Sequence, residues 1–367
     1  MIQKTIRVNT QDIYLKLKSE ILNSEIPFGN LLMPENELAE IMHVSRPTIT
    51  KIYNTLQTEG LVIKKAGFGT SVTYKKNDTK FRFGLLLPGA GESEIFSTIN
   101  DQFLSQGKKR NFDCLWEGTV ANDAEIRKGV ALNICKNYIE EKVDGIFFAP
   151  LERTPGSEKL NEEICRLIEK SDIPLVLIDR DIYPFPNRSN YDLVGIDNYH
   201  GGYVMAQHLI SAGCKTVYFF HRPDSAYSVN LRIDGVRAAL ENAGLNFNKS
   251  NIVCGEPDDV TRIREMNIIP FETGIICGND STAASLISGL ESIGLKITSD
   301  VLVAGFDNMK YSVHLKYPLT TYQQPCEAIT ESSVDLIFNK LSIKNSRPVT
   351  VNLYGDVIQR ASTVFVH

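Results

Sequence analysis

From Phe81 onward, the chain repeats short apolar runs that are separated by longer amphipathic segments. The runs are FGLLLP, DGIFFAP, PLVLID, LVGID, TVYFF, NIVC, TGIICGN and VLVAGF. Each run suits a buried strand, and the segments between them suit helices. Strands that alternate with helices predict parallel sheets with helices on both faces. This pattern constrains the fold more than any other feature, and it predicts an α/β architecture over residues 81–367.

Polar side chains are expected to gather where these strands end, because ligands of open parallel sheets bind beyond the carboxyl ends of the strands. The residues at the predicted strand ends are Pro88, Pro150, Asp179, Asp197, His221, Asn279 and Asp307. Asp197 has a second interpretation, since an Asp before Asn198 can cap the helix that contains Gly201 and Gly202. We therefore leave Asp197 out of the predicted site.

The first 75 residues show helical periodicity instead. Three helices are expected, beginning near Thr10, after Pro34 and at Ser45, which suits an N-cap. Each helix has an apolar face. The inward residues are Ile13, Tyr14, Leu17, Ile21 and Leu22 in the first helix, Leu38, Ile41 and Met42 in the second, and Ile49, Ile52, Tyr53 and Leu56 in the third. Gly60 ends the third helix.

A hairpin is expected after these helices. Segments 61–65 and 70–73 flank AGFG, whose glycines suit a turn. Three helices followed by a hairpin make a winged helix. The polar, basic stretch after the hairpin fits a short linker. The predicted organisation is a winged helix-turn-helix domain at 1–75, a linker at 76–80 and a larger domain at 81–367.

Charge divides the chain in the same way. The net charge is -5, yet residues 1–76 hold ten basic and seven acidic residues, whereas the remainder holds 29 basic and 37 acidic. Only the first segment therefore suits a polyanionic partner. The third helix leaves six polar residues off its apolar stripe, namely Ser45, Arg46, Thr48, Thr50, Lys51 and Asn54. Such side chains meet bases and phosphates when a helix enters a major groove, although an isolated helix face of this kind is more often simply solvated.

Three motifs closely resemble the DNA-binding domain of the GntR family: ENELA at 35–39, VSRPT at 44–48 and GFGT at 67–70. The resemblance covers roughly the first 75 residues. It implies that DNA is contacted by Asn36, Ser45, Arg46, Thr48 and Gly67, and we add Lys51 from the exposed face of the third helix. One departure is visible, because LMP stands at 32–34 where the family usually has Leu-Pro-Ser. The serine that would help to cap the second helix is therefore missing.

Six ordered segments resemble the effector domain of LacI-type repressors and the related periplasmic sugar-binding proteins. They are IPLVLIDR at 173–180, VGIDNYHGG at 194–202, NLRIDG at 230–235, CGND at 277–280, GFDN at 305–308 and PLTTYQQP at 318–325. The resemblance covers residues 81–367 and implies two lobes with a cleft between them. Together with a GntR-type head, it is similar to the arabinose-repressor subgroup. The cleft residues that it implies are Asp179, Arg180, Arg232, Asn279, Asp307 and Gln324.

These residue types suit a sugar. Adjacent sugar hydroxyls both donate and accept hydrogen bonds, so carboxylates can accept from them while guanidinium groups donate in pairs. A closed cleft must satisfy each buried charge. The apolar face of a sugar also favours an aromatic wall, and the candidates are Phe96, Trp116, Tyr183, Tyr227 and Tyr311. We choose Phe96, which follows the first strand, although aromatic residues are more often part of a core.

Several classes of protein fit poorly. No apolar run approaches the roughly 18 residues of a membrane span, and the start of the chain lacks the apolar core of a signal peptide, so we expect a cytoplasmic protein without a membrane partner. Seven scattered cysteines without a Cys-x-x-Cys pair argue against disulfides and zinc. Phosphate-loop, serine-hydrolase, zinc-protease and dinucleotide motifs are missing. We expect no catalysis, no cofactor and no metal.

The sequence therefore predicts a homodimeric transcriptional regulator, a repressor of sugar-metabolism genes, whose operator binding is controlled by a monosaccharide. Three alternatives stay open. The effector can be a purine or nucleoside, which aromatic cleft residues would favour, whereas paired carboxylates favour a sugar. A sugar-binding protein that does not bind DNA conflicts with the winged helix. A sugar-modifying enzyme lacks a nucleophile and a general base.

Overall fold

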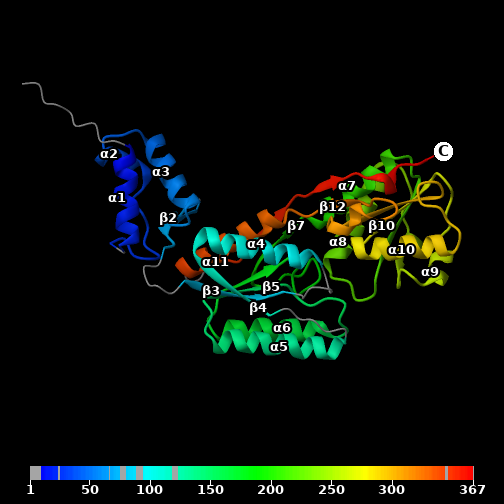
Figure 1. The fold of residues 1–367 in the computed structure, drawn as a ribbon, viewed down its shortest axis with the longest axis horizontal. Helices are drawn as coiled ribbons and strands as arrows, with labels where there is room; N and C mark the ends of the chain where they lie inside the picture. The colour runs from blue at the N-terminus through cyan, green and yellow to red at the C-terminus, as the bar shows by residue number, and fades with distance from the viewer. Residues whose placement is uncertain are drawn as a thin grey trace, which may run out of the picture.

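The computed structural model describes residues 10–23, 25–65, 67–74, 80–87, 94–117, 123–343 and 346–366. A small N-terminal domain stands beside a larger body with two lobes (Figure 1). Of the predicted linker at 76–80, only Lys80 is described, and Pro88 also lies outside the described residues. None of the described helices is both long and apolar enough to cross a bilayer.

The N-terminal domain is the predicted winged helix. Its elements are α1 (Thr10–Leu22), α2 (Glu35–Ile41), α3 (Arg46–Thr58), β1 (Val62–Lys65) and β2 (Gly69–Val72). The two strands pair antiparallel. Gly60 has a φ of 72° where α3 ends, and Gly67 has a φ of 79° in the wing turn. Both values lie in the left-handed region, which favours glycine.

One inward residue of the winged helix was predicted wrongly. Ile41 is 57% exposed, while Leu38 and Ala39 are buried. At 3.6 residues per turn, the packed face of this short helix is centred between Leu38, Ala39 and the following Met42, and Ile41 falls to one side of it. The other apolar positions predicted for α1 and α3 all lie in or against the domain core.

The first lobe is a six-stranded parallel sheet in the order β13-β7-β6-β5-β3-β4. Its strands are β3 (Phe81–Leu86), β4 (Phe112–Trp116), β5 (Gly145–Phe148), β6 (Leu175–Ile178), β7 (Asp192–Ile196) and β13 (Thr350–Leu353). Helices cover both faces, as predicted (Figure 1). One face packs against α4 (Glu94–Arg110) and α11 (Cys326–Ser342), and the other against α5 (Ala124–Glu140) and α6 (Ser157–Lys170).

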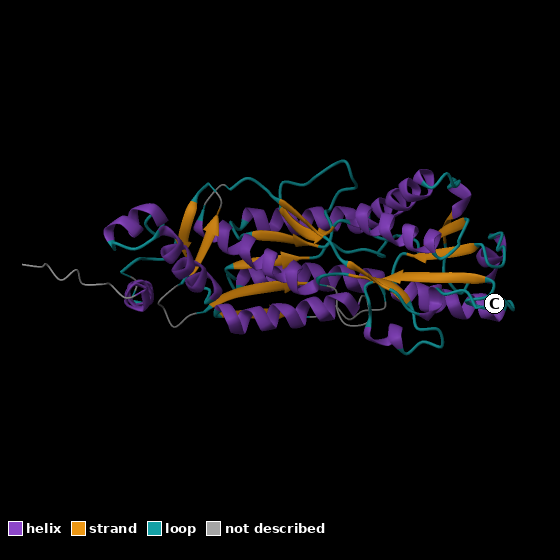
Figure 2. Ribbon diagram, turned by 90° about the horizontal axis from the view of Figure 1, so that it is seen from above, coloured by secondary structure: helices purple, strands orange, loops and turns teal. Residues whose placement is uncertain are grey.

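The second lobe repeats this architecture with the order β14-β12-β11-β10-β8-β9. Its strands are β8 (Thr216–His221), β9 (Ile252–Cys254), β10 (Thr273–Cys277), β11 (Val301–Phe306), β12 (Thr320–Gln323) and β14 (Asp356–Ile358). Its helices are α7 (Asn198–Ser211), α8 (Ser228–Asn242), α9 (Val260–Glu265) and α10 (Asp280–Ser292). The edge strand β14 runs antiparallel to β12, which the alternation of strands and helices did not predict. Figure 2 shows the two sheets side by side along the body.

Within the described residues, the chain passes between the lobes at three short connections, at 196–198, 323–326 and 353–356. Short connections of this kind can act as a hinge between two rigid sheets. The second connection leads directly into α11, whose far end meets the winged helix. There the rings of Phe28 and Phe81 lie 5.4 Å apart, those of Phe81 and Phe338 lie 5.2 Å apart, and Lys65 Nζ donates to Asn339 Oδ1 at 3.3 Å.

Candidate functional site

A polar cavity of about 40 Å³ lies between the lobes, at the carboxyl ends of both sheets. The structure brings all six motif-derived residues together in its lining: Asp179, Arg180, Arg232, Asn279, Asp307 and Gln324. Larger pockets flank it on either side. One of about 430 Å³ shares Asp179 and Arg180 with the cavity, and one of about 510 Å³ shares Asp307 and Gln324.

The small volume reflects closed lobes. The backbone N–H of Arg153 in the first lobe donates to the carbonyl of Asp224 in the second at 2.6 Å, and the N–H of Ala226 donates to Glu152 at 3.0 Å. A space of this size holds only a few water molecules. A ligand the size of a sugar therefore requires the lobes to separate at these contacts.

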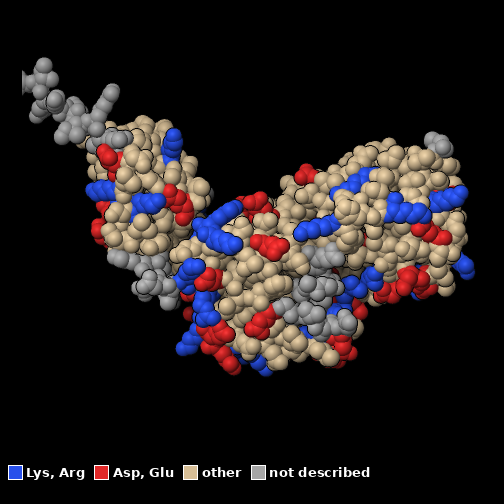
Figure 3. All heavy atoms as spheres, in the orientation of Figure 1, with Lys and Arg blue, Asp and Glu red and all other residues tan. Residues whose placement is uncertain are grey.

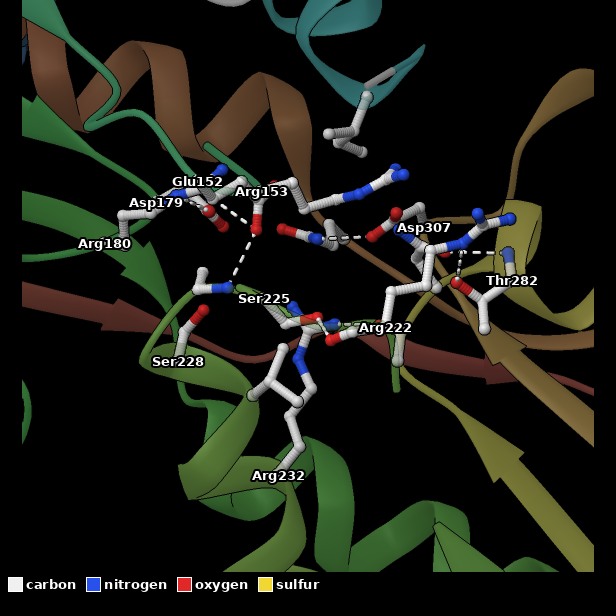
Figure 4. Close-up of a pocket in the computed structure, with 16 residues that line it drawn as sticks. Glu152, Arg153, Asp179, Arg180, Arg222, Ser225, Ser228, Arg232, Thr282 and Asp307 are labelled. Carbon is white, nitrogen blue, oxygen red and sulfur yellow. Dashed lines mark hydrogen bonds and ion pairs between the residues drawn. The ribbon is translucent and has the colours of Figure 1, made fainter. Parts of the chain in front are cut away.

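Arg180 is the centre of a buried charge network (Figure 4). Its guanidinium lies 2.7 Å from Glu152 Oε2 and 2.9 Å from Asp179 Oδ2, and its side chain is only 5% exposed. Burial opposes ionisation of Glu152, but the charge and hydrogen bond of Arg180 outweigh it and lower the Glu152 pKa. The two carboxylates raise the pKa of Arg180 against its own burial. Glu152 and Arg180 thus both stay charged near neutral pH.

Asp307 and Gln324 form a second polar pair in the cavity. Gln324 Nε2 donates to Asp307 Oδ1 at 2.7 Å. Burial raises the pKa of Asp307 to about 6, while the charge of Arg232 and the hydrogen bond from Gln324 act in the opposite direction. Asp307 also has a φ of 104°, and Asp179 has a φ of 71°. Residues other than glycine seldom adopt such values, which are concentrated at functional sites.

A buried carboxylate supports the Asp307 loop from below. Asp280 accepts the hydroxyl of Thr321 at 2.6 Å and the backbone N–H of Met309 at 2.8 Å. Burial and the nearby charge of Asp307 raise the pKa of Asp280 to about 8. Asp280 does not line the cavity, so it positions the loop that presents Asp307.

Arg232 and Asn279 are partly engaged by the second lobe itself. Arg232 donates to Asn198 Oδ1 at 2.8 Å and to the carbonyl of Gly278 at 2.7 Å, and its guanidinium lies 4.4 Å from the centre of the Phe306 ring. Asn279 caps α10, where its side-chain oxygen accepts the N–H of Thr282. Its amide NH₂ group is the part suited to donate to a ligand. Asp197, set aside earlier, caps α7.

The aromatic wall predicted at Phe96 is not in the cavity. Phe96 is fully buried, its ring lies 5.5 Å from the Arg180 guanidinium, and the neighbouring Ile95 lines the cavity instead. The helix α4 turns Phe96 toward the sheet because apolar burial dominates there. Tyr183 and Tyr227 line the 430 Å³ flanking pocket, while Trp116 and Tyr311 pack against the core of the molecule.

Several cavity residues were missed from the sequence, notably Glu152, Arg153, Arg222, Ser225 and Thr282. Most follow the predicted strand ends at Pro150 and His221 by one to four residues. Loop residues after the last residue of a strand also turn into the cleft, and the strand pattern does not fix which of them do. Their short distance from the strand ends is the sequence signal that identifies them.

The predicted DNA-contacting residues lie on the surface of the winged helix. Asn36, Ser45, Arg46, Lys51 and Gly67 are exposed and Thr48 is half-buried. Ser45 and Thr48 share a hydrogen bond at 2.8 Å, and Ser45 makes no cap bond to the α3 backbone. Basic side chains are visible on this domain in Figure 3.

Other polar residues of α3 are held by Glu35 and Lys64. Thr50 donates to Glu35 Oε2 at 2.6 Å, and Lys64 donates to Glu35 Oε1 at 2.8 Å and to Asn54 Oδ1 at 2.7 Å. These hydrogen bonds, that of Lys64 first, lower the pKa of Glu35. Arg46 stays 66% exposed at 3.7 Å from Glu35. Arg46 and Lys51 thus remain exposed on the surface of α3.

Comparisons with known proteins agree with both halves of this structure. Residues 9–72 match the gntR family of bacterial regulatory proteins, and residues 206–363 match the periplasmic binding protein-like domain. The PurR HTH-type transcriptional repressor of Histophilus somni is 28% identical over 255 residues, which are 64% of this chain and 73% of that protein. The PurR repressor of Pasteurella multocida is 24% identical over 343 residues, which are 89% of this chain and 97% of that protein.

Solved structures share the fold. A LacI family regulator from Enterococcus faecium with bound ribose has a TM-score of 0.60 at 22% identity, covering 78% of this chain and 100% of its own. The CelR regulator in complex with cellobiose has a TM-score of 0.63 at 19% identity, covering 86% of this chain and 90% of its own. The chain is therefore a transcriptional regulator that joins a gntR-type DNA-binding domain to a periplasmic binding protein-like domain, and it shares its fold with LacI family regulators.

Proposed function

We propose that this regulator is a repressor whose winged helix binds operator DNA and whose interlobe cleft binds a monosaccharide that controls the binding. The observation that carries this proposal is the cavity at the two sets of strand ends, which carboxylates and guanidinium groups of both lobes line together. Sugar hydroxyls can replace the contacts that these groups make with one another. Structural neighbours were solved with ribose and with cellobiose.

The contacts between the lobes and the position of α11 support a route from the cleft to the winged helix. A sugar that opens and then recloses the lobes moves Gln324, which lies directly before α11 and bonds Asp307. At the other end of the same helix, Phe338 and Asn339 meet Phe81 and Lys65. A rigid helix that touches both sites can bias them together.

The regulator is proposed to act as a homodimer in the bacterial cytoplasm, where two winged helices read the two halves of a palindromic operator. The sugar is proposed to relieve repression by changing how the two heads are held. This linkage is reciprocal, so DNA must weaken sugar binding by the same factor by which sugar weakens DNA binding.

A purine or nucleoside effector is the second candidate, and one observation favours it. The 430 Å³ flanking pocket is lined by Tyr183, Tyr199 and Tyr227, whose rings suit a flat base. The central cavity, in contrast, has no aromatic residue among the described residues that line it. The many charged side chains that line the central cavity make the sugar the better-supported effector.

Thermal-shift screening followed by DNA-binding titration tests the proposal. The panel contains pentoses, hexoses, deoxyhexoses and nucleobases, and a cleft ligand raises the melting temperature by mass action. Arg232→Ala is expected to abolish the shift and keep DNA binding by the empty protein, whereas Arg166→Gln, on the exposed face of α6, is expected to change neither. A DNA affinity that no sugar in the panel changes would argue against a sugar signal.

A further inference from the structure

Two arginines from opposite lobes meet at one end of the cavity. Arg153 follows β5 in the first lobe, and Arg222 follows β8 in the second. Figure 4 shows both side chains reaching toward the same end of the pocket, near Asp307. Arg222 is held there by Glu256 at 2.6 Å and by Thr282 at 3.3 Å. Two like charges therefore face the same small space.

Arg153 is the unmatched charge of the cavity. Its guanidinium has no hydrogen-bond or ion-pair partner in the part of the chain that the structure describes, although the side chain is only half exposed. The three carboxylates of the lining are engaged elsewhere, because Glu152 and Asp179 pair with Arg180 and Asp307 pairs with Gln324. Burial and the charge of Arg222 lower the pKa of Arg153, and the charges of Glu152 and Glu256 offset this only in part.

The backbone holds Arg153 in this position. Arg153 has a φ of 48° and Asp224 has a φ of 51°, both in the left-handed region. The hydrogen bond from Arg153 N–H to the Asp224 carbonyl joins these two residues across the cleft. Strained backbone that fixes an unpaired cation against a second cation is costly unless a ligand supplies the missing negative charge.

We propose that this end of the cleft is an anion subsite, and that the effector is a sugar carrying a terminal phosphate or carboxylate group. The inference rests on the proposed function and names the chemistry of the ligand. Arg153 and Arg222 would hold the anion from the two lobes, since guanidinium groups bind such oxyanions in paired fashion. The NH₂ group of Asn279, at the N-terminus of α10, adds a further donor. The neutral part of the sugar then lies toward Arg180.

Calorimetric titration of matched ligands tests the subsite. Each set contains a neutral sugar, its phosphate ester and its sugar acid, such as glucose, glucose 6-phosphate and glucuronate. Wild-type protein is expected to bind one charged member about 10- to 100-fold more tightly than the neutral sugar, as charged hydrogen bonds of this number imply. The preferred charged member distinguishes phosphate from carboxylate.

Arg153→Gln is expected to remove this preference and to leave affinity for the neutral sugar within about threefold. Arg153→Lys keeps the positive charge but loses the paired donors of the guanidinium group, and it is expected to retain part of the preference for the charged sugar. The matched control is Arg166→Gln, which removes one exposed positive charge far from the cavity and is expected to change nothing. Equal losses for neutral and charged ligands in Arg153→Gln, or tighter binding of the neutral sugar by wild type, would overturn the subsite.

The outcomes separate this inference from the proposed function. A neutral sugar that binds wild type and releases DNA keeps the proposed function and defeats the subsite. A charged sugar that binds through Arg153 without changing DNA affinity supports the subsite and contradicts the proposed function. Inorganic phosphate is the probe when no sugar binds: a melting shift that Arg153→Gln abolishes supports the subsite, and a shift that Arg153→Gln leaves unchanged, or no shift at all, rejects it.

Discussion

The winged helix and the interlobe cleft both present cations to a ligand, but they hold them in opposite ways. Arg46 on the winged helix is 66% exposed and only loosely paired, whereas Arg180 in the cleft is 5% exposed and bound to two carboxylates. An extended polyanion can be met by exposed, independent side chains. A small polar ligand needs side chains fixed by their neighbours. Substitutions should therefore act on stability in the cleft and on affinity in the winged helix.

The largest effect is expected for Arg180→Ala. It leaves Glu152 and Asp179 buried without their cation, and breaking such a network costs about 3–5 kcal/mol of unfolding free energy. Urea denaturation measures the loss. The control is Arg166→Ala, which breaks an exposed pair with Glu162 and should cost less than about 1 kcal/mol. Similar costs for the two variants would remove the contrast between buried and exposed charges.

Arg46→Ala should instead weaken DNA binding and leave stability unchanged. Loss of one base or phosphate contact is expected to weaken operator binding by about 1–3 kcal/mol. The melting temperature and sugar affinity should stay unchanged, because Arg46 is exposed and distant from the cleft. Fluorescence anisotropy with DNA selected from a random pool measures the change. If Arg46→Ala binds the operator as tightly as wild type does, the N-terminal end of α3 does not contact DNA.

The position of each residue explains how much could be predicted from the sequence. The winged helix was predictable because its apolar spacing and turn glycines act over a few residues, as at Ile49, Leu56 and Gly60. Cleft residues such as Asp179 and Asp307 were reached through ordered motifs at strand ends. Their joint presence in one cavity depends on the packing of two distant sheets, which no local pattern contains.

The features that were predicted wrongly or missed also depend on packing that no local sequence pattern contains. Phe96 was assigned to the ligand because it follows a strand, but burial turns it beneath Arg180. Arg153 and Arg222 were missed because a charged loop residue has no periodicity that fixes its direction. The antiparallel edge strand β14 was missed because its three residues carry no strong strand signal.

The buried charges of the cleft should also make the stability of the protein depend on pH. Asp307 has a pKa of about 6 in the folded protein, above its ordinary value of 3.8. The folded state therefore holds this proton more tightly than the unfolded state, and the contribution of Asp307 to stability is greatest below about pH 4 and declines as pH rises to about 6. Relative to Asp307→Asn, wild type should lose about 2 kcal/mol of unfolding free energy between pH 4 and pH 6. Parallel pH profiles from urea denaturation would contradict the assignment.

The smallest effect is expected at the contact between the winged helix and α11. Lys65→Ala removes one partly exposed hydrogen bond to Asn339, which is worth about 0.5–1 kcal/mol. It should reduce the factor by which the effector changes DNA affinity and leave effector affinity in the absence of DNA unchanged. Asn339→Ala should have the same effect, and the double variant should add little more. Additive effects of the two substitutions would show that this contact does not carry the coupling.

Linked titration of the two ligands tests the central claim most directly. The affinity of wild type for selected operator DNA is measured with and without the tightest-binding sugar or charged sugar, and the affinity for that sugar is measured with and without DNA. The account predicts that each ligand weakens the other by the same factor, about 5- to 150-fold, and that Arg232→Ala abolishes both changes. A sugar that occupies the cleft while operator affinity stays constant would contradict it.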